Sequence, residues 1–180
     1  MNMKKSDVNP LPGFFDRYIN LVEEEGLFEA LIQSKELVDG LDKNKLLGLG
    51  DKVYAPGKWT IKDIFQHIID TERILTYRAL RFARTDQTLL PGYDEELYGK
   101  TSLAINRALE DILDELLIVR ESSIRLFKSF DISVMQNSGI CFHQKISVVA
   151  LGFVVAGHQH HHLRVIKERY MPLLENPVHL

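Results

Sequence analysis

The chain of 180 residues has little cysteine, little tryptophan and no marked excess of charge of either sign. Cys141 is its single cysteine, so no internal disulfide can form, and we expect a cytoplasmic protein from a reducing compartment. The net charge of -3 leaves no basic footprint, so we expect no nucleic-acid partner.

The sequence also lacks a run long and apolar enough for a membrane helix. The longest stretch without Lys, Arg, Asp or Glu covers residues 146–163, and its mainly apolar part ends near Gly157. About 12 apolar residues are too few to span a bilayer. No apolar run behind the charged N-terminus could serve as a signal peptide. We therefore expect no membrane association and interpret 146–163 as part of a buried helix.

What remains is an ordinary globular composition, with 45% hydrophobic and 26% charged residues. A chain of this length can bury a core without disulfides. We expect one domain over residues 1–180, with an irregular lead-in at 1–13 and a poorly structured tail at 172–180.

Helical spacing of apolar residues dominates the pattern, and no strand-like alternation of any length accompanies it. It predicts four main helices and therefore an all-α bundle with at least one long crossover. The predicted helices cover residues 14–39, 60–84, 102–130 and 147–170.

Local signals indicate where these helices begin and break. Thr60 with Asp63 forms a capping-box arrangement, and Thr101 or Ser102 is the expected cap of the third helix. The run Glu23-Glu24-Glu25-Gly26 can bend or break the first helix. We also expect a short helical turn at 42–47, loop or short extended structure at 131–145, and a helix end at Pro172.

The connection over residues 85–100 is longer than neighbouring antiparallel helices need. It can cross an end of the bundle or cover a site as a lid, which makes Tyr93, Asp94 and Tyr98 candidate pocket residues. In the third helix, the face opposite the apolar stripe is interpreted as solvated surface, with Glu110, Asp111, Asp114, Glu115 and Arg120.

Four of the seven histidines lie between residues 158 and 162. His158 and His162 share one helix face, in line with the buried apolar residues, whereas His160 points to the opposite side and His161 lies on the flank. His67 lies at the edge of the apolar stripe of the second helix. If the two helices pack together, three neutral imidazoles can hold one ion and leave a fourth position open.

Other interpretations compete with this one. The histidines can be hydrogen-bonded core residues, or His160 and His161 can bind metal loosely at the surface. A protease of the His-Glu-x-x-His type is disfavoured because Gln159 replaces the glutamate. Di-iron chemistry is disfavoured because no histidine has a glutamate three residues before it. Cys141 is interpreted as inert packing rather than a nucleophile.

Several segments together resemble the DinB superfamily. They are Pro56-Gly57-Lys58-Trp59-Thr60-Ile61 leading to His67, Asp70-Thr71-Glu72-Arg73, Tyr77 to Arg84, and Ala156-Gly157-His158 to His162-Leu163. The resemblance implies a four-helix bundle in an up-down-down-up order, often dimeric. It also implies a divalent metal held by His67, His158 and His162, while characterised relatives include enzymes that use low-molecular-weight thiols.

We therefore predict a metal-dependent enzyme that activates water or a low-molecular-weight thiol, as a hydrolase or a thiol transferase. The expected ion is zinc, with nickel, iron and manganese as alternatives, and the expected partners are a small-molecule substrate and a second copy in a homodimer. The sequence names no catalytic residue. The alternative is a non-catalytic metal-binding or stress-associated dimeric helical bundle.

Overall fold

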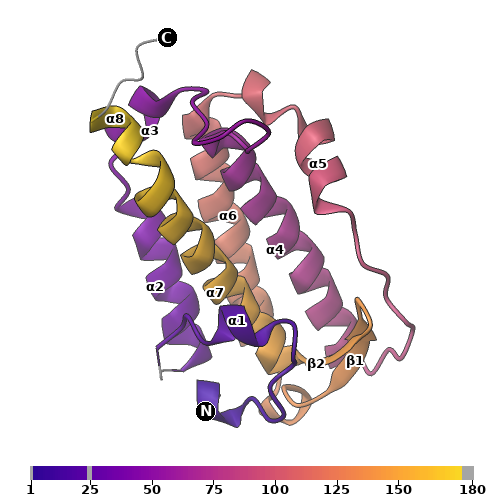
Figure 1. Ribbon diagram of the computed structural model, residues 1–180. Coiled ribbons are helices and arrows are strands. Elements are labelled where there is room, and N and C mark those ends of the chain that lie inside the picture. Colours follow the sequence, from indigo (N-terminus) through magenta and orange to yellow (C-terminus); the bar gives the residue numbers. More distant parts are fainter. Residues whose placement is uncertain (1, 24–25, 176–180) are drawn as a thin grey trace.

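In the computed structural model, four long helices form a bundle, and shorter elements are arranged around its ends (Figure 1). The structure describes residues 2–23 and 26–175. α2 and α4 each pack against both α6 and α7, which confirms the predicted helical bundle. The long helices are α2 (Leu27–Asp39), α4 (Ile61–Ala83), α6 (Leu109–Lys128) and α7 (Val148–Val165).

The remaining elements are short. The helices are α1 (Asp16–Ile19), α3 (Lys43–Leu49), α5 (Glu95–Ser102) and α8 (Pro172–Glu175). The 3-10 turns are η1 (Lys5–Asp7), η2 (Ala104–Asn106) and η3 (Ile132–Val134), and η4 (Ile166–Tyr170) is π-helical. The strands are β1 (Ser138–Cys141) and β2 (Gln144–Ser147).

The first predicted helix is interrupted. It becomes α1 and α2, and the break includes Gly26, which has an extended backbone and precedes the first residue of α2. Glu24 and Glu25, part of the run expected to bend or break it, lie outside the described residues. The separation allows α1 to lie across α7 (Figure 1).

The second and fourth helices begin where the sequence predicts. The Thr60 hydroxyl accepts from the Asp63 amide, and the Asp63 carboxylate accepts from the Thr60 amide, so the capping box is complete. Ser147 caps α7 by accepting from Ala150. The helical course continues through η4 to Tyr170 and ends before Pro172, as expected, but Pro172 begins the short helix α8 within the segment predicted to be a poorly structured tail. Residues 176–180 of the predicted tail lie outside the described residues.

The predicted start of the third helix is wrong. Thr101 and Ser102 end α5, where their hydroxyls donate to the carbonyls of Leu97 and Gly99. The Ser102 hydroxyl also accepts from the Ala104 amide at the start of η2, and neither residue caps α6. Leu103 then adopts a left-handed conformation with φ 52°, which no helix can continue through. The third long helix therefore begins only at Leu109, and the long connection carries a helix of its own.

Residues 138–147 form a two-stranded antiparallel hairpin, which confirms the short extended structure predicted there. Its turn is at Phe142 and His143, whose positive φ values of 49° and 59° match the turn that suits the strand twist. Leu90, in the long connection, exchanges backbone hydrogen bonds with the hairpin at Ile140 and Phe142. The connection is thus tied to the end of the bundle.

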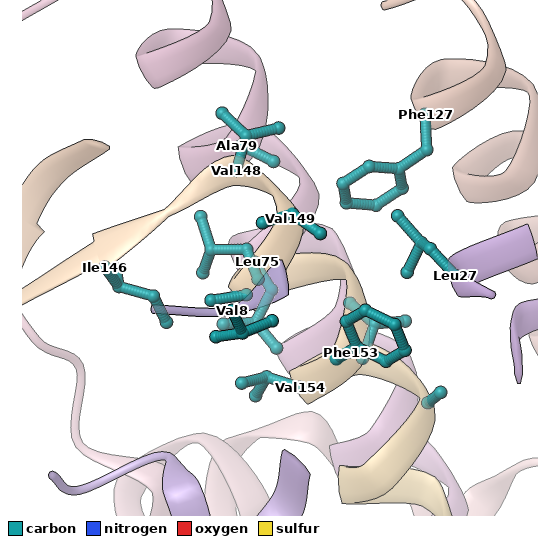
Figure 2. Packing of buried hydrophobic residues seen from close by; sticks show 14 of the residues in the cluster. Val8, Leu27, Leu75, Ala79, Phe127, Ile146, Val148, Val149, Phe153 and Val154 are labelled. Carbon is teal, nitrogen blue, oxygen red and sulfur yellow. The ribbon is translucent and has the colours of Figure 1, made fainter. Parts of the chain in front are cut away.

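Buried apolar side chains form two clusters. One lies at the hairpin end, where Leu75 of α4 and Phe153 and Val154 of α7 pack with Val8 of the N-terminal segment (Figure 2). The other joins the beginnings of α4 and α6 to η4. Between the two clusters the long helices contribute buried polar residues, and we call four of them, one from each helix, the polar layer: Ser34, Glu72, Arg120 and Gln159.

Arg120 contradicts the prediction that it belongs to a solvated face. Its side chain is 1% exposed and forms a bidentate ion pair with Glu72, with nitrogen to oxygen distances of 2.8 and 2.9 Å. It also donates to the Ser34 hydroxyl and to the carbonyl of Val155. Arg120 of α6 therefore contacts all three other long helices. Glu115, on the same predicted face, is half-buried by its ion pairs with arginines.

Among the described residues, no helix combines the length and the apolar character that crossing a membrane requires.

Candidate metal centre

His67, His158 and His162 come together in the middle of the bundle. α4 supplies the first, and α7 supplies the other two one helical turn apart. His67 and His158 are each 5% exposed, and His162 is half-buried. One ring nitrogen from each residue lies within 4.8 Å of the other two. The structure thus unites the three histidines that spacing and resemblance select.

The ring nitrogens fit a single divalent ion. The Nε2 atom of His158 lies 3.1 Å from Nε2 of His67 and 3.1 Å from Nε2 of His162. Nitrogens bound about 2.0–2.1 Å from a tetrahedral zinc ion lie roughly 3.3 Å apart. Each Nε2 carries either one proton or one lone pair, so hydrogen bonding alone cannot match all three atoms well. A cation between them satisfies three lone pairs at once.

Their surroundings keep these imidazoles neutral. Burial, followed by repulsion from His161, lowers the pKa of His67 to about 4. Burial and the neighbouring histidines hold the pKa values of His158 and His162 well below the ordinary value. The lone pairs needed for metal coordination are therefore available at neutral pH.

Aromatic and hydroxyl groups hold the histidine rings in place. The Trp59 ring lies 4.7 Å from the His67 ring, and the Tyr18 ring lies 5.2 Å from the His158 ring, measured between centroids. The Thr71 hydroxyl lies 3.5 Å from Nδ1 of His67 and 2.6 Å from the Tyr93 hydroxyl. A proton on Nδ1 would point to Thr71 and leave Nε2 free as a ligand.

Two cavities reach the histidines. The first, of about 260 Å³, is lined by His158 and by side chains of α4, α7 and the N-terminal segment, and we call it the Arg78 cavity. The second, of about 370 Å³, is lined by His67, His162 and Trp59, and we call it the Trp59 cavity. Arg17, Tyr18 and Glu95 line both. A small molecule can therefore approach the three nitrogens.

The model of the DinB superfamily matches residues 33–166, well over half of the chain. The chain belongs to the DinB superfamily. A relative from Oceanobacillus iheyensis, named "Putative metal-dependent hydrolase", is 30% identical over 141 residues, which are 73% of this chain and 74% of the relative. The solved structure of YfiT from Bacillus subtilis matches with a TM-score of 0.63 at 18% identity, over 88% of this chain and 87% of YfiT.

YfiT is described as a probable metal-dependent hydrolase with an unusual four-helix bundle topology. At this identity the likeness shows the fold alone. The family assignment of the DinB-superfamily chain therefore rests on the family model and the Oceanobacillus relative, and the YfiT structure supports the bundle.

Only some of the predicted pocket residues of this DinB-superfamily chain line a cavity. Tyr93 and Asp94 line the Arg78 cavity, as expected. Tyr98 lines neither cavity, and its ring packs on Tyr93 instead. His161 lines the Trp59 cavity, whereas His160 is absent from the lining of both. Cys141 is fully buried, and burial raises the pKa of its thiol, in agreement with an inert packing role.

The acidic residues close to His67 in sequence, Asp63 and Asp70, do not belong to the histidine group and form other contacts. Asp63 completes the α4 cap. Asp70 is half-buried and accepts from Gln66, whose own carbonyl accepts from Arg107. Burial raises the pKa of Asp70, and the Gln66 hydrogen bond opposes this.

Sequence reasoning missed several groups beside the histidines. Glu95 is an exposed carboxylate that lines both cavities, and Tyr18 and Trp59 form walls. Arg78 is buried at the first cavity. Trp59 was within reach, because it is the single tryptophan and precedes the α4 cap. The others carry no local signal, since only the packing of α1, α5 and α4 brings them to the site.

Proposed function

We propose that this DinB-superfamily chain is a metal-dependent enzyme whose ion is bound by His67, His158 and His162. The observation that carries the proposal is the convergence of three neutral imidazoles at the meeting point of two cavities. Among residues 2–23 and 26–175 no fourth acidic, cysteine or histidine ligand joins the group. Three protein ligands with an open position are typical of catalytic zinc sites, whereas structural sites are closed by four.

A divalent ion at this place would act as a Lewis acid that lowers the pKa of a bound water or thiol. The residues of the chain do the rest. Uncharged histidines leave the positive charge of the ion undiminished, and Thr71 with Tyr93 orients His67. The rings of Trp59 and Tyr18 restrict water. Glu95 is the carboxylate placed to accept a proton from a group entering through either cavity.

Hydrolysis is the favoured reaction, and its support is the name of the Oceanobacillus relative. Thiol transfer is the second candidate, because the same open position suits a thiolate. Zinc is the proposed ion, with nickel, iron and manganese as alternatives, since imidazole binds all of them. To separate the reactions, turnover of p-nitrophenyl esters is compared with conjugation of bacillithiol to an aryl chloride. Ester turnover without added thiol supports the hydrolase, and strict dependence on the thiol supports the transferase.

Removing one imidazole should remove the ion. Protein purified without a nickel column should carry about one divalent ion per chain, measured by mass spectrometry. His67→Ala and His162→Ala should each lose nearly all of it, because two remaining imidazoles from this set bind weakly. Turnover should fall with the metal content.

His160→Ala is the matched control. It removes an imidazole from the same helix, but His160 lines neither cavity, so metal content and turnover should remain unchanged. An empty wild type, or a His67→Ala variant that keeps its ion, would mean that the triad is not the metal site. A metal-loaded wild type with full turnover in His162→Ala would refute the catalytic role.

Other predictions accompany this proposal. We propose a small-molecule substrate, a cytoplasmic location, a homodimer, and one domain over residues 1–180. We also propose the up-down-down-up order of the long helices, supported by the hairpin, near which α4 ends and from which α7 begins.

A further inference from the structure

Arg78 is a buried cation without a carboxylate partner. Its side chain is 5% exposed, and its one hydrogen bond runs from Nη2 to the carbonyl of Pro91, over 2.8 Å. No Asp or Glu among the described residues lies within ion-pair distance of it. A buried guanidinium that lacks a counter-charge is costly, so its retention needs a reason.

The other buried arginine, Arg120, has its charge neutralised by a carboxylate within the protein. Arg120 has a bidentate carboxylate and two further acceptors. Arg78 has one neutral acceptor and lines the cavity that also contains His158. Its remaining N–H groups have no protein acceptor in the described part of the chain. They also keep some accessible surface, so a ligand in the cavity can reach them. The missing anion is therefore one that enters from outside.

Apolar and aromatic side chains form the other inner walls of the Arg78 cavity. Phe15, Leu75 and Val154 are all buried and line it. The other charged lining groups, Arg17, Asp94 and Glu95, are exposed, and Asp94 is engaged as the N-cap of α5. The inner cavity thus combines an apolar body with a single positive charge.

We infer that the Arg78 cavity binds an organic carboxylate, with its carboxylate on Arg78 and its apolar body between Leu75 and Val154. One guanidinium balances the single charge of a carboxylate and matches its two oxygens. A phosphate dianion would keep excess negative charge beside Asp94 and Glu95. This inference rests on the proposed function in one respect, because the reacting end of the ligand is placed at His158 and the proposed metal ion.

Helix geometry adds a length requirement. Arg78 and His67 are eleven residues apart on α4, which corresponds to about 16 Å along the axis. Because the two residues lie about three helical turns apart, we take the ligand to carry a spacer between its carboxylate and its reacting end. The substrate class is therefore a carboxylic acid whose reactive group is separated from the carboxylate by an apolar spacer.

The test measures charge preference and needs no turnover. The probe is 4-phenylbutyrate, and its uncharged partner is 4-phenylbutyramide, both titrated by calorimetry into the purified protein. Wild type should bind the acid at least about tenfold more tightly than the amide, because the amide is uncharged and offers the guanidinium one acceptor oxygen instead of two. Arg78→Met should abolish this ratio, and Arg78→Lys should restore part of it. Arg84→Met removes an exposed arginine at the end of α4 that lines neither cavity, and it should preserve the ratio.

The ratio separates recognition from a structural role, since loss of the Pro91 contact would weaken acid and amide alike. A repeat on protein emptied of metal by a chelator separates the anion site from the ion. A preference that survives metal removal and disappears in Arg78→Met supports the inference even if the proposed enzyme activity fails. Equal binding of acid and amide, no binding of either, or a preference that follows the metal and not Arg78 overturns it.

Discussion

Replacing Arg120 with methionine should lower the free energy of unfolding by about 3–5 kcal/mol, the usual cost of leaving one member of a buried ion pair alone. Methionine fills a similar volume, so the loss comes from charge and hydrogen bonds rather than from a cavity. The Glu72 carboxylate, only 2% exposed, would lose both its guanidinium contacts at 2.8 and 2.9 Å. The Ser34 hydroxyl and the Val155 carbonyl would lose a donor.

Urea denaturation of the metal-free protein checks this value, with Lys35→Met as the matched control. Lys35 of α2 and Glu121 of α6 also form an ion pair between two long helices, but their side chains are 37% and 39% exposed. Their loss should leave the unfolding midpoint nearly unchanged, because exposed pairs contribute little. The double variant Glu72→Leu with Arg120→Met should regain most of the stability. Equal effects of Arg120→Met and Lys35→Met would show that burial does not govern the pair.

Adding a single methyl group at Gly157 should also destabilise the fold, by about 1–3 kcal/mol, as overpacking does in other cores. A Cβ atom there would lie 2.0 Å from the carbonyl oxygen of Tyr18 and 2.6 Å from its carbonyl carbon. Both are backbone atoms, so no side-chain rotation can relieve the clash. α1 would have to move away from α7, and the Tyr18 ring would leave its place beside His158.

Gly48→Ala provides the comparison for Gly157→Ala. Gly48 also lies inside a helix, but its Cβ would meet only the tip of the Leu174 side chain, at 3.4 Å. That variant should be neutral or slightly more stable, because alanine favours helices over glycine. The two melting temperatures are compared, together with the metal content of each. A Gly157→Ala protein as stable as wild type would mean that α1 is not held tightly against α7.

The parts of the fold that could be predicted depend on signals close in sequence. α4 was anticipated within a residue or two because apolar spacing and the Thr60 cap agree. The histidine pair of α7 was anticipated because four residues make one turn. Where local signals conflict with packing, prediction failed, as at Ser102, whose hydroxyl bonds within α5 while Leu103 turns left-handed.

Buried charges were the least predictable feature. Arg120 follows Val119 on the edge of an apolar stripe, where an arginine is usually solvated. Its partner Glu72 lies 48 residues earlier, and no spacing rule connects them. Arg78 gave no signal for the same reason, since its burial depends on the connection through Pro91 folding back over α4. Such contacts are decided by the assembled bundle.

The polar layer also sets the axial register of the helices. A slip of α6 by one turn, about 5.4 Å, would bring Leu116 or Ile124 opposite Glu72. The Glu72 carboxylate would then be buried among apolar side chains without a partner. Apolar layers alone tolerate such slippage better, because one leucine replaces another. The ion pair fixes α6 against α4, and the hydrogen bond from Arg120 to the Val155 carbonyl fixes α6 against α7. Together they help to keep α4 and α7 at the height where His67 meets His158. The buried ion pair therefore helps to position the metal ligands by fixing the axial register of the helices that supply them.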